Sequence, residues 1–269
     1  SGPAGFAWPG ALAMREVGVS LGDMAAPTTL RIADLKGRLG EAMAGTFTGA
    51  EFRIAAVPLD VLDGAGEWRY AGSKLDLSGA TLRVEDRQVD DRFRPLIARD
   101  ATLHFADSDL TANALLREPQ SDRPVVEARI AHNTATTVGR ADLTVPGILF
   151  DNKLQPDTLS ALALGVIANA RGTLTGTGEI VWNAAGVTSK GSFSTDGLDF
   201  AAAFGPVKGT SGTVVFTDLL GLVTAPDQRL KIASINPGIE VTNGEASFAL
   251  QGNGVLVVNG AKWPFVDGT

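Results

Sequence analysis

Few residues of this chain could take part in catalysis or metal binding, and they are scattered. His104 and His132 are the two histidines, and each lies in a stretch that alternates like a β-strand. Two histidines cannot complete a three-ligand zinc site without carboxylates, and no His-Glu-x-x-His spacing is present. We therefore interpret both histidines as structural residues, at the surface or at strand ends, that bond backbone groups, and we predict no metal site.

Two further stretches resemble ion-binding motifs. Residues 85–94 carry four carboxylates and three arginines, but their spacing is not that of an EF-hand, so a loop of mixed charge is favoured. Gly172–Gly178 resembles a phosphate-binding loop, but it lacks the Gly-Lys-Ser/Thr ending and opens a strand rather than a helix. The chain has no cysteine and no Gly-x-Ser-x-Gly motif. We predict no catalytic residue and no cofactor, and we expect that the protein is not an enzyme.

The composition favours a folded, β-rich protein. The chain has 269 residues, of which 44% are apolar and 32 are glycine. That glycine content, about 12% against an average of about 7%, suits short strands and tight turns better than helices. The formal net charge of −7 argues against nucleic-acid binding, which needs a basic face. The apolar opening from Phe6 to Met14 is interrupted by Pro9, and it is too short to span a bilayer and lacks the basic start of a signal peptide.

Apolar and polar residues alternate from end to end of the chain. Within Thr173–Trp182, Leu174 and Ile180 share one phase with glycines, while threonines occupy most of the other. Because successive strand side chains point to opposite faces, this pattern predicts antiparallel strands with one dry face. Turn signals such as Asp63-Gly64 and Asn243-Gly244 separate the runs, as in consecutive hairpins. About 16–18 strands would make an open sheet roughly 75–85 Å long, which is expected to coil into a groove or to split in two.

Helix signals are scarce. The best is Gln155–Ile167, with Asp157 as its N-cap and apolar residues at spacings of three and four. Weaker signals lie at 218–222 and 57–62, and we interpret all three as short lids or plugs on a sheet. The polar stretch 116–124 is a candidate for a subdivision but is short enough for a hairpin loop, so we predict one continuous unit over residues 1–269.

The second half carries a more specific series of glycine, proline and aromatic residues. The series is Leu154-Gln-Pro-Asp-Thr-Leu-Ser160, Gly178-Glu-Ile-Val-Trp182, Gly191-Ser-Phe193, Gly205-Pro-Val-Lys-Gly209 continuing to Phe216, Thr224-Ala-Pro-Asp-Gln228, Ile235-Asn-Pro-Gly238 and Lys262-Trp-Pro-Phe265. In order and spacing it resembles the C-terminal region of YdbH-like proteins, a branch of the AsmA-like family whose domain has also carried the label "dicarboxylate transport". Residues 57–62, Gly66-Glu-Trp68 and Ala131-His132 followed by Phe150 resemble the preceding part of the same region.

The resemblance implies a periplasmic protein of the Gram-negative cell envelope, anchored in the inner membrane by an N-terminal helix. Its fold would be mostly β, a long and strongly twisted antiparallel β-groove with one or two short helices, and the groove would carry phospholipid acyl chains between the two membranes. That anchor is not in this sequence, so we expect an excised segment of a longer protein. The resemblance also implies a small outer-membrane lipoprotein that pairs with an open strand edge. Raw sheet edges further predict edge-to-edge self-association of the fragment.

The apolar phases of the strands supply candidate residues for the lipid groove. They are Leu75, Leu77, Leu82, Leu103, Phe105, Leu143, Leu174, Ile180, Trp182, Phe193, Leu198, Phe200, Phe216, Phe248 and Leu250. Periodicity does not distinguish an open groove from a filled core, so a structural or adhesive exported β-scaffold without ligand is the alternative. Transport of a small dicarboxylate is a weaker alternative, because a dianion needs converging arginines or helix N-termini.

Overall fold

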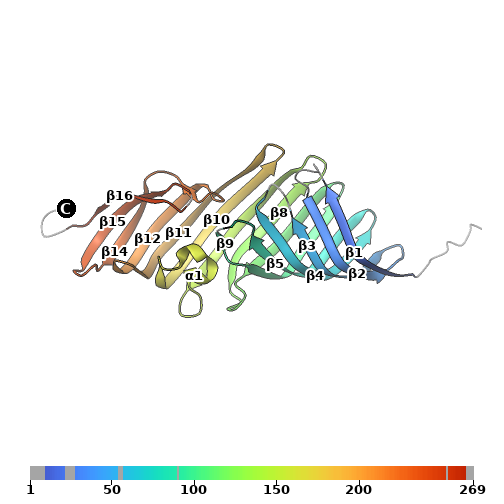
Figure 1. Cartoon of the computed structure of the whole chain (residues 1–269), viewed down its shortest axis with the longest axis horizontal. Helices are drawn as coiled ribbons and strands as arrows, with labels where there is room; N and C mark the ends of the chain where they lie inside the picture. The colour runs from blue at the N-terminus through green and yellow to red at the C-terminus, as the bar shows by residue number, and fades with distance from the viewer. Residues whose placement is uncertain (1–9, 22–27, 54–56, 90, 253, 265–269) are drawn as a thin grey trace, which may run out of the picture.

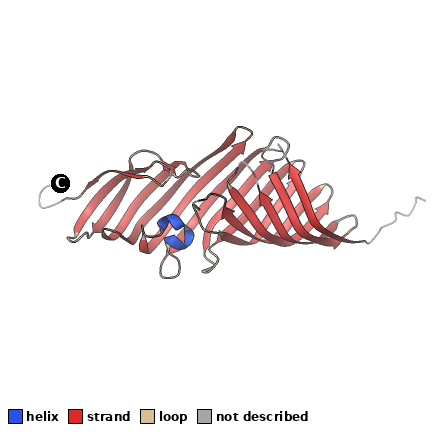
Figure 2. Cartoon of the chain, viewed as in Figure 1, coloured by secondary structure: helices blue, strands red, loops and turns tan. Residues whose placement is uncertain are grey.

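The structure is a computed structural model that describes residues 10–21, 28–53, 57–89, 91–252 and 254–264. These residues form one antiparallel sheet of sixteen strands, paired in chain order, with β13 beside β12 and β14 following β12 (Figures 1 and 2). The strands are β1 (Ala11–Leu21), β2 (Thr28–Arg38), β3 (Met43–Arg53), β4 (Leu59–Ala71), β5 (Lys74–Asp86), β6 (Leu96–Ala106), β7 (Asp109–Arg117), β8 (Pro124–Asn133), β9 (Val138–Phe150), β10 (Ala168–Asn183), β11 (Gly186–Ala202), β12 (Gly205–Asp218), β13 (Val223–Thr224), β14 (Gln228–Ile235), β15 (Val241–Leu250) and β16 (Leu256–Lys262).

The sheet is open, with β1 and β16 at its two ends, and it is a groove rather than a closed barrel in the residues that the structure describes. Figure 1 shows it strongly twisted, with β1–β4 in front of the strands that follow them and β10–β16 spread out at the other end of the molecule. The predicted mostly β, antiparallel groove is therefore confirmed.

β-Bulges explain both the curvature and an apparent break in the sequence pattern. In β5 the apolar phase moves from Leu75 and Leu77 to Ala80 and Leu82, and the pairing with β6 shifts register between Leu77 and Ala80. Gly79 lies between them with a φ of 54°. The extra residue returns the next side chain to the same face, so that all four apolar residues pack in one cluster. Such bulges also increase the local twist that coils a sheet.

The best of the predicted helices is present but shorter than expected. Helix α1 covers Pro156–Leu159, and a 3₁₀ turn, η1, covers Ala161–Ala163. The N-cap is Gln155 rather than Asp157, because Pro156 takes the first helical position, where its missing N–H leaves no bond unmade. Ser160 separates the two pieces: its extended backbone ends α1, and its side chain accepts a bond from the N–H of Leu162 in η1.

The two weaker helix predictions are wrong. Residues 219–222 form a turn between β12 and β13, closed by a bond from Leu222 N to Leu219 O of 3.3 Å. Residues 57–62 lead directly into β4, which begins at Leu59 opposite Asp86 of β5. Pairing with two neighbouring strands outweighs a weak local helix preference here. The polar stretch 116–124 covers the end of β7, the loop 118–123 and the first residue of β8, which pairs with β7.

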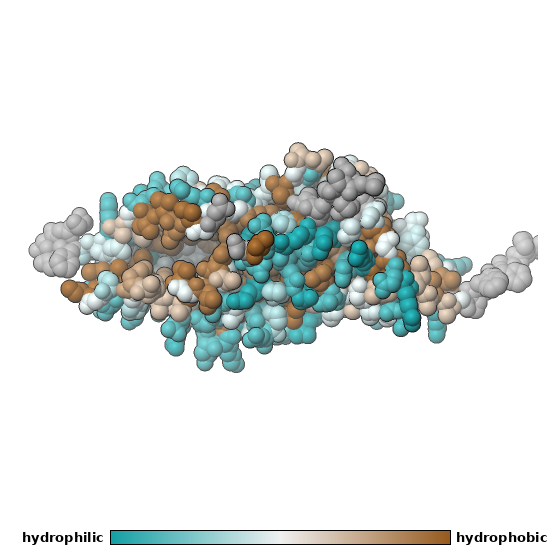
Figure 3. All heavy atoms as spheres, viewed as in Figure 1, coloured by the Kyte–Doolittle hydropathy of each residue, from teal (hydrophilic) through white to brown (hydrophobic). Residues whose placement is uncertain are grey.

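The inner face of the curved sheet holds two apolar clusters. The larger cluster extends from Phe47 and Trp68 to Phe150 and Leu154, and the smaller one contains Ile180 with Val57, Ala141 and Trp182. In Figure 3, brown apolar residues gather over the C-terminal half of the chain, while teal polar residues cover much of the N-terminal half from the same side. This difference agrees with a twisted sheet that turns its inner face toward the viewer at one end and its outer face at the other.

Candidate functional site

Strand register aligns the side chains of the inner face in rows that cross most of the sheet. One continuous row, here called the central row, joins directly paired residues from β1 to β11. It consists of Leu12, Gly37, Gly45, Trp68, Leu77, Leu103, Ala112, Ile130, Ala141, Ile180 and Ser189. Directly paired residues of antiparallel strands project to the same face. The central row is therefore an almost unbroken apolar stripe at right angles to the strands.

A second row lies two residues away along each strand and so faces the same side. It consists of Met43, Tyr70, Leu75, Phe105, Leu110, His132, Gly139, Trp182 and Val187. The ring of His132 and the hydroxyl group of Tyr70 are its most polar groups. Together the two rows give the inner face an apolar band that crosses the molecule from the N-terminal strands to β11.

The large aromatic rings of this face lie over glycines of neighbouring strands. A Cβ atom at Gly37 would overlap the indole of Trp68, and a Cβ at Gly139 would overlap that of Trp182. Phe193 covers Gly176 in the same way, and Trp263 covers Gly244. Each ring therefore packs against bare backbone instead of standing up from the sheet, which keeps the floor of the groove low.

All fifteen predicted groove residues lie in described strands, and none is exposed. Ile180 and Trp182 are buried, and the other thirteen are partly buried. Register brings Leu77, Leu103 and Ile180 together in the central row, and Leu75, Phe105 and Trp182 in the second row. Contact with lipid at these residues stays a prediction, because partial burial is compatible with a groove wall and with a filled core.

Several inner-face residues are missing from the predicted set. Trp68 and Phe47 are buried in the larger cluster, as are Leu96 and Phe150. Phe47 shares a two-residue phase with Gly45 and Met43, so alternation could have found it. Trp68 is harder to find, because its strand shifts register with both neighbours, which obscures the period.

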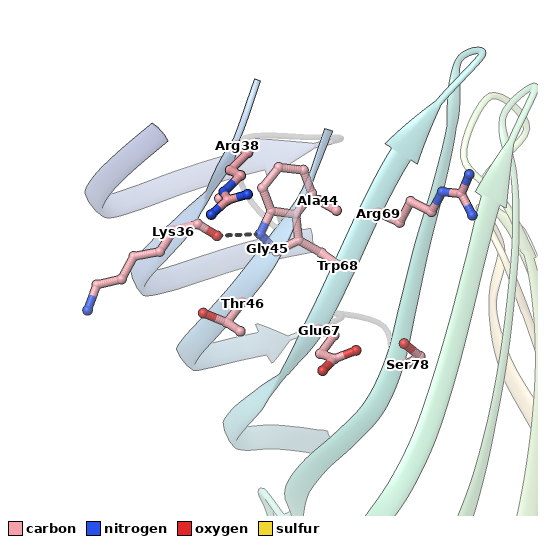
Figure 4. Close-up of a pocket in the computed structure, with 10 residues that line it drawn as sticks. Lys36, Arg38, Ala44, Gly45, Thr46, Glu67, Trp68, Arg69 and Ser78 are labelled. Atoms are coloured by element: carbon pink, nitrogen blue, oxygen red, sulfur yellow. Dashed lines mark hydrogen bonds between the residues drawn. The ribbon is translucent and has the colours of Figure 1, made fainter. Parts of the chain in front are cut away.

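A hollow of about 640 Å³ lies beside Trp68, where the glycines of β2 and β3 supply no side chains. The indole Nε1 donates a hydrogen bond to the carbonyl oxygen of Lys36, 3.0 Å away, which fixes the ring over these glycines (Figure 4). Arg38, Glu67 and Arg69 complete the charged part of the lining. In Figure 4 the side chains of Lys36 and Arg69 point in opposite directions, so the cations do not converge on one point.

Three connecting segments meet over the inner face. They are residues 87–89 and 91–95, which the structure describes between β5 and β6, the α1–η1 segment, and the turn 219–222. Arg92 joins them: its Nη1 donates to Leu220 O at 2.9 Å, and its own carbonyl accepts from Ser160 Oγ at 2.6 Å. Figure 1 shows the loop after β5 beside α1. Because these bonds join residues 68 and 128 positions apart, they tie the two halves of the coiled sheet together.

The three connecting segments are here called the overlay. Charged groups beneath the overlay are paired within the chain. Both Nε and Nη2 of Arg92 donate to the carboxylate of Asp86 at 2.7 Å, and the side chains are 10% and 0% exposed. Burial raises the pKa of Asp86, but hydrogen bonds from Arg92 outweigh it, so that the pKa lies below its ordinary value. Burial likewise raises the pKa of Asp60, and bonds from Arg87 and Arg53 bring it below its ordinary value. These ion pairs fasten the overlay, and their guanidinium groups already bind carboxylates of the chain.

Over the described ranges, no helix is long and apolar enough to cross a membrane. The family model for YdbH-like proteins, described as "Intermembrane phospholipid transport protein YdbH", matches residues 1–269. The chain belongs to the YdbH-like family. No curated protein and no solved structure matches it. The family name thus connects this YdbH-like chain with phospholipid transport between membranes, and its fold is the groove described above.

Each of the two histidines of this YdbH-like chain contacts another side chain of the sheet. His104 Nδ1 contacts an oxygen of Asp76 at 2.6 Å on the exposed side of the sheet. His132 packs on Trp182 with ring centroids 5.9 Å apart, and burial lowers its pKa. Within the described ranges, no group of three or more His, Asp and Glu side chains could hold a metal ion. Asp90, part of the acidic stretch of the sequence, lies outside the described residues.

Proposed function

We propose that this YdbH-like chain is one length of a periplasmic bridge that conducts phospholipids between the inner and outer membranes, with their acyl chains against the inner face. The observation that carries the proposal is the central row. It supplies an almost unbroken apolar stripe from β1 to β10, perpendicular to the strands and ending at Ser189 of β11, in a sheet whose backbone groups bond one another. A strand ladder that satisfies its own polar groups can present a continuous dry surface to hydrocarbon.

The energetics suit a conduit better than a tight binding site. Removing one methylene from water stabilises by about 0.8 kcal/mol, so that an acyl chain of about 16 carbons gains roughly 13 kcal/mol. Extraction from a bilayer costs about the same amount. Transfer from membrane to groove is therefore nearly neutral, and a lipid can both enter and leave. Such a role needs no catalytic residue, and its net direction must be set elsewhere.

The alternatives differ in what they need from the inner face. A small dicarboxylate needs free cations that converge, whereas Arg92 and Arg53 are paired with Asp86 and Asp60. A scaffold without ligand needs only a filled core. That scaffold is the outcome if the purified chain holds no lipid.

We also propose an inner-membrane anchor elsewhere in the full-length protein and a small outer-membrane lipoprotein that adds a strand to an open edge. In support, β16 ends the sheet, and Val255, Leu256 and Val258 on and beside it are exposed. An edge strand with exposed apolar residues is a template for strand addition.

Native mass spectrometry of the purified chain, with extraction of bound lipid, tests the proposed function. Copurified phospholipid is the expected result. Phe248→Asp places a charge on the inner face of β15, and we expect it to reduce lipid loading strongly while the chain stays folded. Ala249→Asp is the matched control, because the adjacent residue projects to the opposite face. Equal loading of both variants, or no lipid in the parent protein, would contradict the proposal.

A further inference from the structure

The turn 219–222 occupies the inner face above two glycines. Gly178 and Gly191 are paired on β10 and β11, between Leu143 of β9 and Phe216 of β12 in the same register row. Cδ2 of Leu219 lies 2.9 Å from the position that a Cβ at Gly178 would take, and 3.3 Å from that at Gly191. The two glycines thus make a slot without side chains between larger apolar walls, and one branched alkyl group of the chain already fills it.

The next residue of the turn continues this packing. Leu220 contacts the smaller apolar cluster, which contains Ile180 and Trp182. Two consecutive leucines of one short turn therefore cover the inner face of β10 and β11, where the central and second rows end. A hydrocarbon chain that moves along the apolar band toward β12–β16 therefore meets this turn.

A small number of polar bonds hold the turn in place. Ser189 of β11 donates to Asp218 Oδ1 at 2.7 Å and accepts from Leu220 N at 2.8 Å. Arg92 donates to the Leu220 carbonyl from the opposite side. Leu222, which closes the turn, has a φ of 53°, a backbone conformation that is unfavourable for leucine. The turn is thus fixed by localised contacts, not by a strand ladder along its length.

We infer that the slot over Gly178 and Gly191 is a binding site for one hydrocarbon chain, and that the turn 219–222 is an internal plug that such a chain displaces. The inference rests on the proposed function and names the place on the inner face where lipid and protein compete. Leucine side chains and an acyl chain bury the same kind of surface, so their exchange replaces one apolar contact with another. The plug occupies the slot while lipid is absent. It leaves the slot when an acyl chain buries the same apolar surface in its place.

A reversible lock tests the plug. We would join turn and sheet with the pair Ser189→Cys and Leu220→Cys, in a chain that has no cysteine of its own. The 2.8 Å between Ser189 Oγ and Leu220 N brings the two backbones within the reach of a disulfide. The matched control is Ser194→Cys with Thr213→Cys, a directly paired couple that joins β11 to β12 and leaves the turn free.

Fluorine NMR of 5-fluorotryptophan protein reports where lipid enters. The probe is a phosphatidylcholine with a paramagnetic doxyl group on its acyl chain, supplied in vesicles of phosphatidylethanolamine and phosphatidylglycerol. We expect it to broaden the Trp68 and Trp182 resonances of the reduced protein. In the oxidised 189–220 pair Trp68 still broadens and Trp182 stays sharp, whereas the control pair shows both broadened in either state. Equal broadening of Trp182 in the locked and reduced forms would overturn the plug, and no broadening anywhere would instead overturn the proposed function.

A second variant keeps the test independent of disulfide geometry. Leu219→Ala removes the side chain that fills the slot, and we expect a several-fold increase in lipid loading by native mass spectrometry. Leu164→Ala is the matched control, because that leucine is 64% exposed in the loop after η1 and supplies none of the atoms nearest to Gly178 or Gly191. Unchanged loading of Leu219→Ala would contradict a self-occupied site.

Discussion

The indole ring of Trp182 on β10 lies over the backbone of Gly139, its directly paired neighbour on β9. The Nε1 of the same ring lies 3.3 Å from the Nδ1 of His132 on β8, the strand on the far side of β9. One aromatic side chain thus covers two neighbouring strands, and the missing side chain at position 139 allows it to do so. A ring that lies over a glycine recurs at Trp68, Phe193 and Trp263, so glycine content and groove shape are directly connected.

Gly139→Ala should destabilise the protein by about 1–3 kcal/mol, because the new methyl group overlaps the indole and the ring must move off the sheet. Urea unfolding followed by circular dichroism measures the change. The control is Gly18→Ala on β1, where an added Cβ meets no atom within 4 Å and the expected change is below about 1 kcal/mol. Equal effects at the two positions would show that the ring is not confined by the glycine.

Arg92→Ala should destabilise by about 3–5 kcal/mol, because it leaves the buried carboxylate of Asp86 without its partner. The control is Arg99→Ala, which breaks an exposed pair with Asp122 whose side chains are 55% and 54% exposed, and the expected loss is about 0–1 kcal/mol. Denaturant titrations of both variants measure the difference. A small effect at Arg92 would mean that the overlay on the inner face does not depend on this ion pair.

Acid should weaken the overlay before it affects the strand ladder. The pKa of Asp86 in the folded protein lies below its ordinary value of 3.8, so the stability it contributes is complete above that value and is lost as pH falls through the folded-state pKa. The bond from Arg123 lowers the pKa of Asp151 to about 2, which extends the same trend to lower pH. The free energy of unfolding should be nearly flat from about pH 7 to about pH 5 and fall below about pH 4.

Asp86→Asn checks this assignment. The variant is less stable at neutral pH, but its free energy of unfolding should fall less steeply with acid, because one depressed pKa has been removed. Urea titrations at a series of pH values give both slopes. Identical slopes in parent and variant would assign the acid sensitivity to other carboxylates.

The open edges of the described sheet should make the chain associate with itself. Val258 of β16 is 63% exposed at one end of the sheet, and Val258→Lys should reduce association, because a charge opposes pairing between edge strands. The control is Val215→Lys on β12, an interior strand where the valine is 43% exposed but no edge is available. Sedimentation velocity over a range of concentrations distinguishes them. A parent chain that stays monomeric throughout would refute this prediction.

Alternation along single strands was enough to predict a mostly β fold and the faces of Leu174, Ile180 and Trp182. It was not enough where bulges reset the period, as on either side of Gly79, or where strand pairing overrode a weak helix signal at residues 57–62. The number of strands left a coiled groove and a split sheet as alternatives, and the family resemblance favoured the groove and supplied the lipid. Contacts such as that of Arg92 with Leu220 join residues 128 positions apart and leave no local pattern to read. The sequence indicated a short lid or plug at 218–222, but the slot that it fills over Gly178 and Gly191 emerges only from three-dimensional packing.

The strands pair almost wholly in the order in which the chain makes them. An added hairpin therefore lengthens such an assembly by about 10 Å without rewiring any existing pair. Duplication or loss of the gene segment that encodes a hairpin is then a simple way for evolution to match the length of the sheet to the distance between the two structures that it connects. In this architecture the length of the sheet is inherited in modules, and it changes by one hairpin at a time.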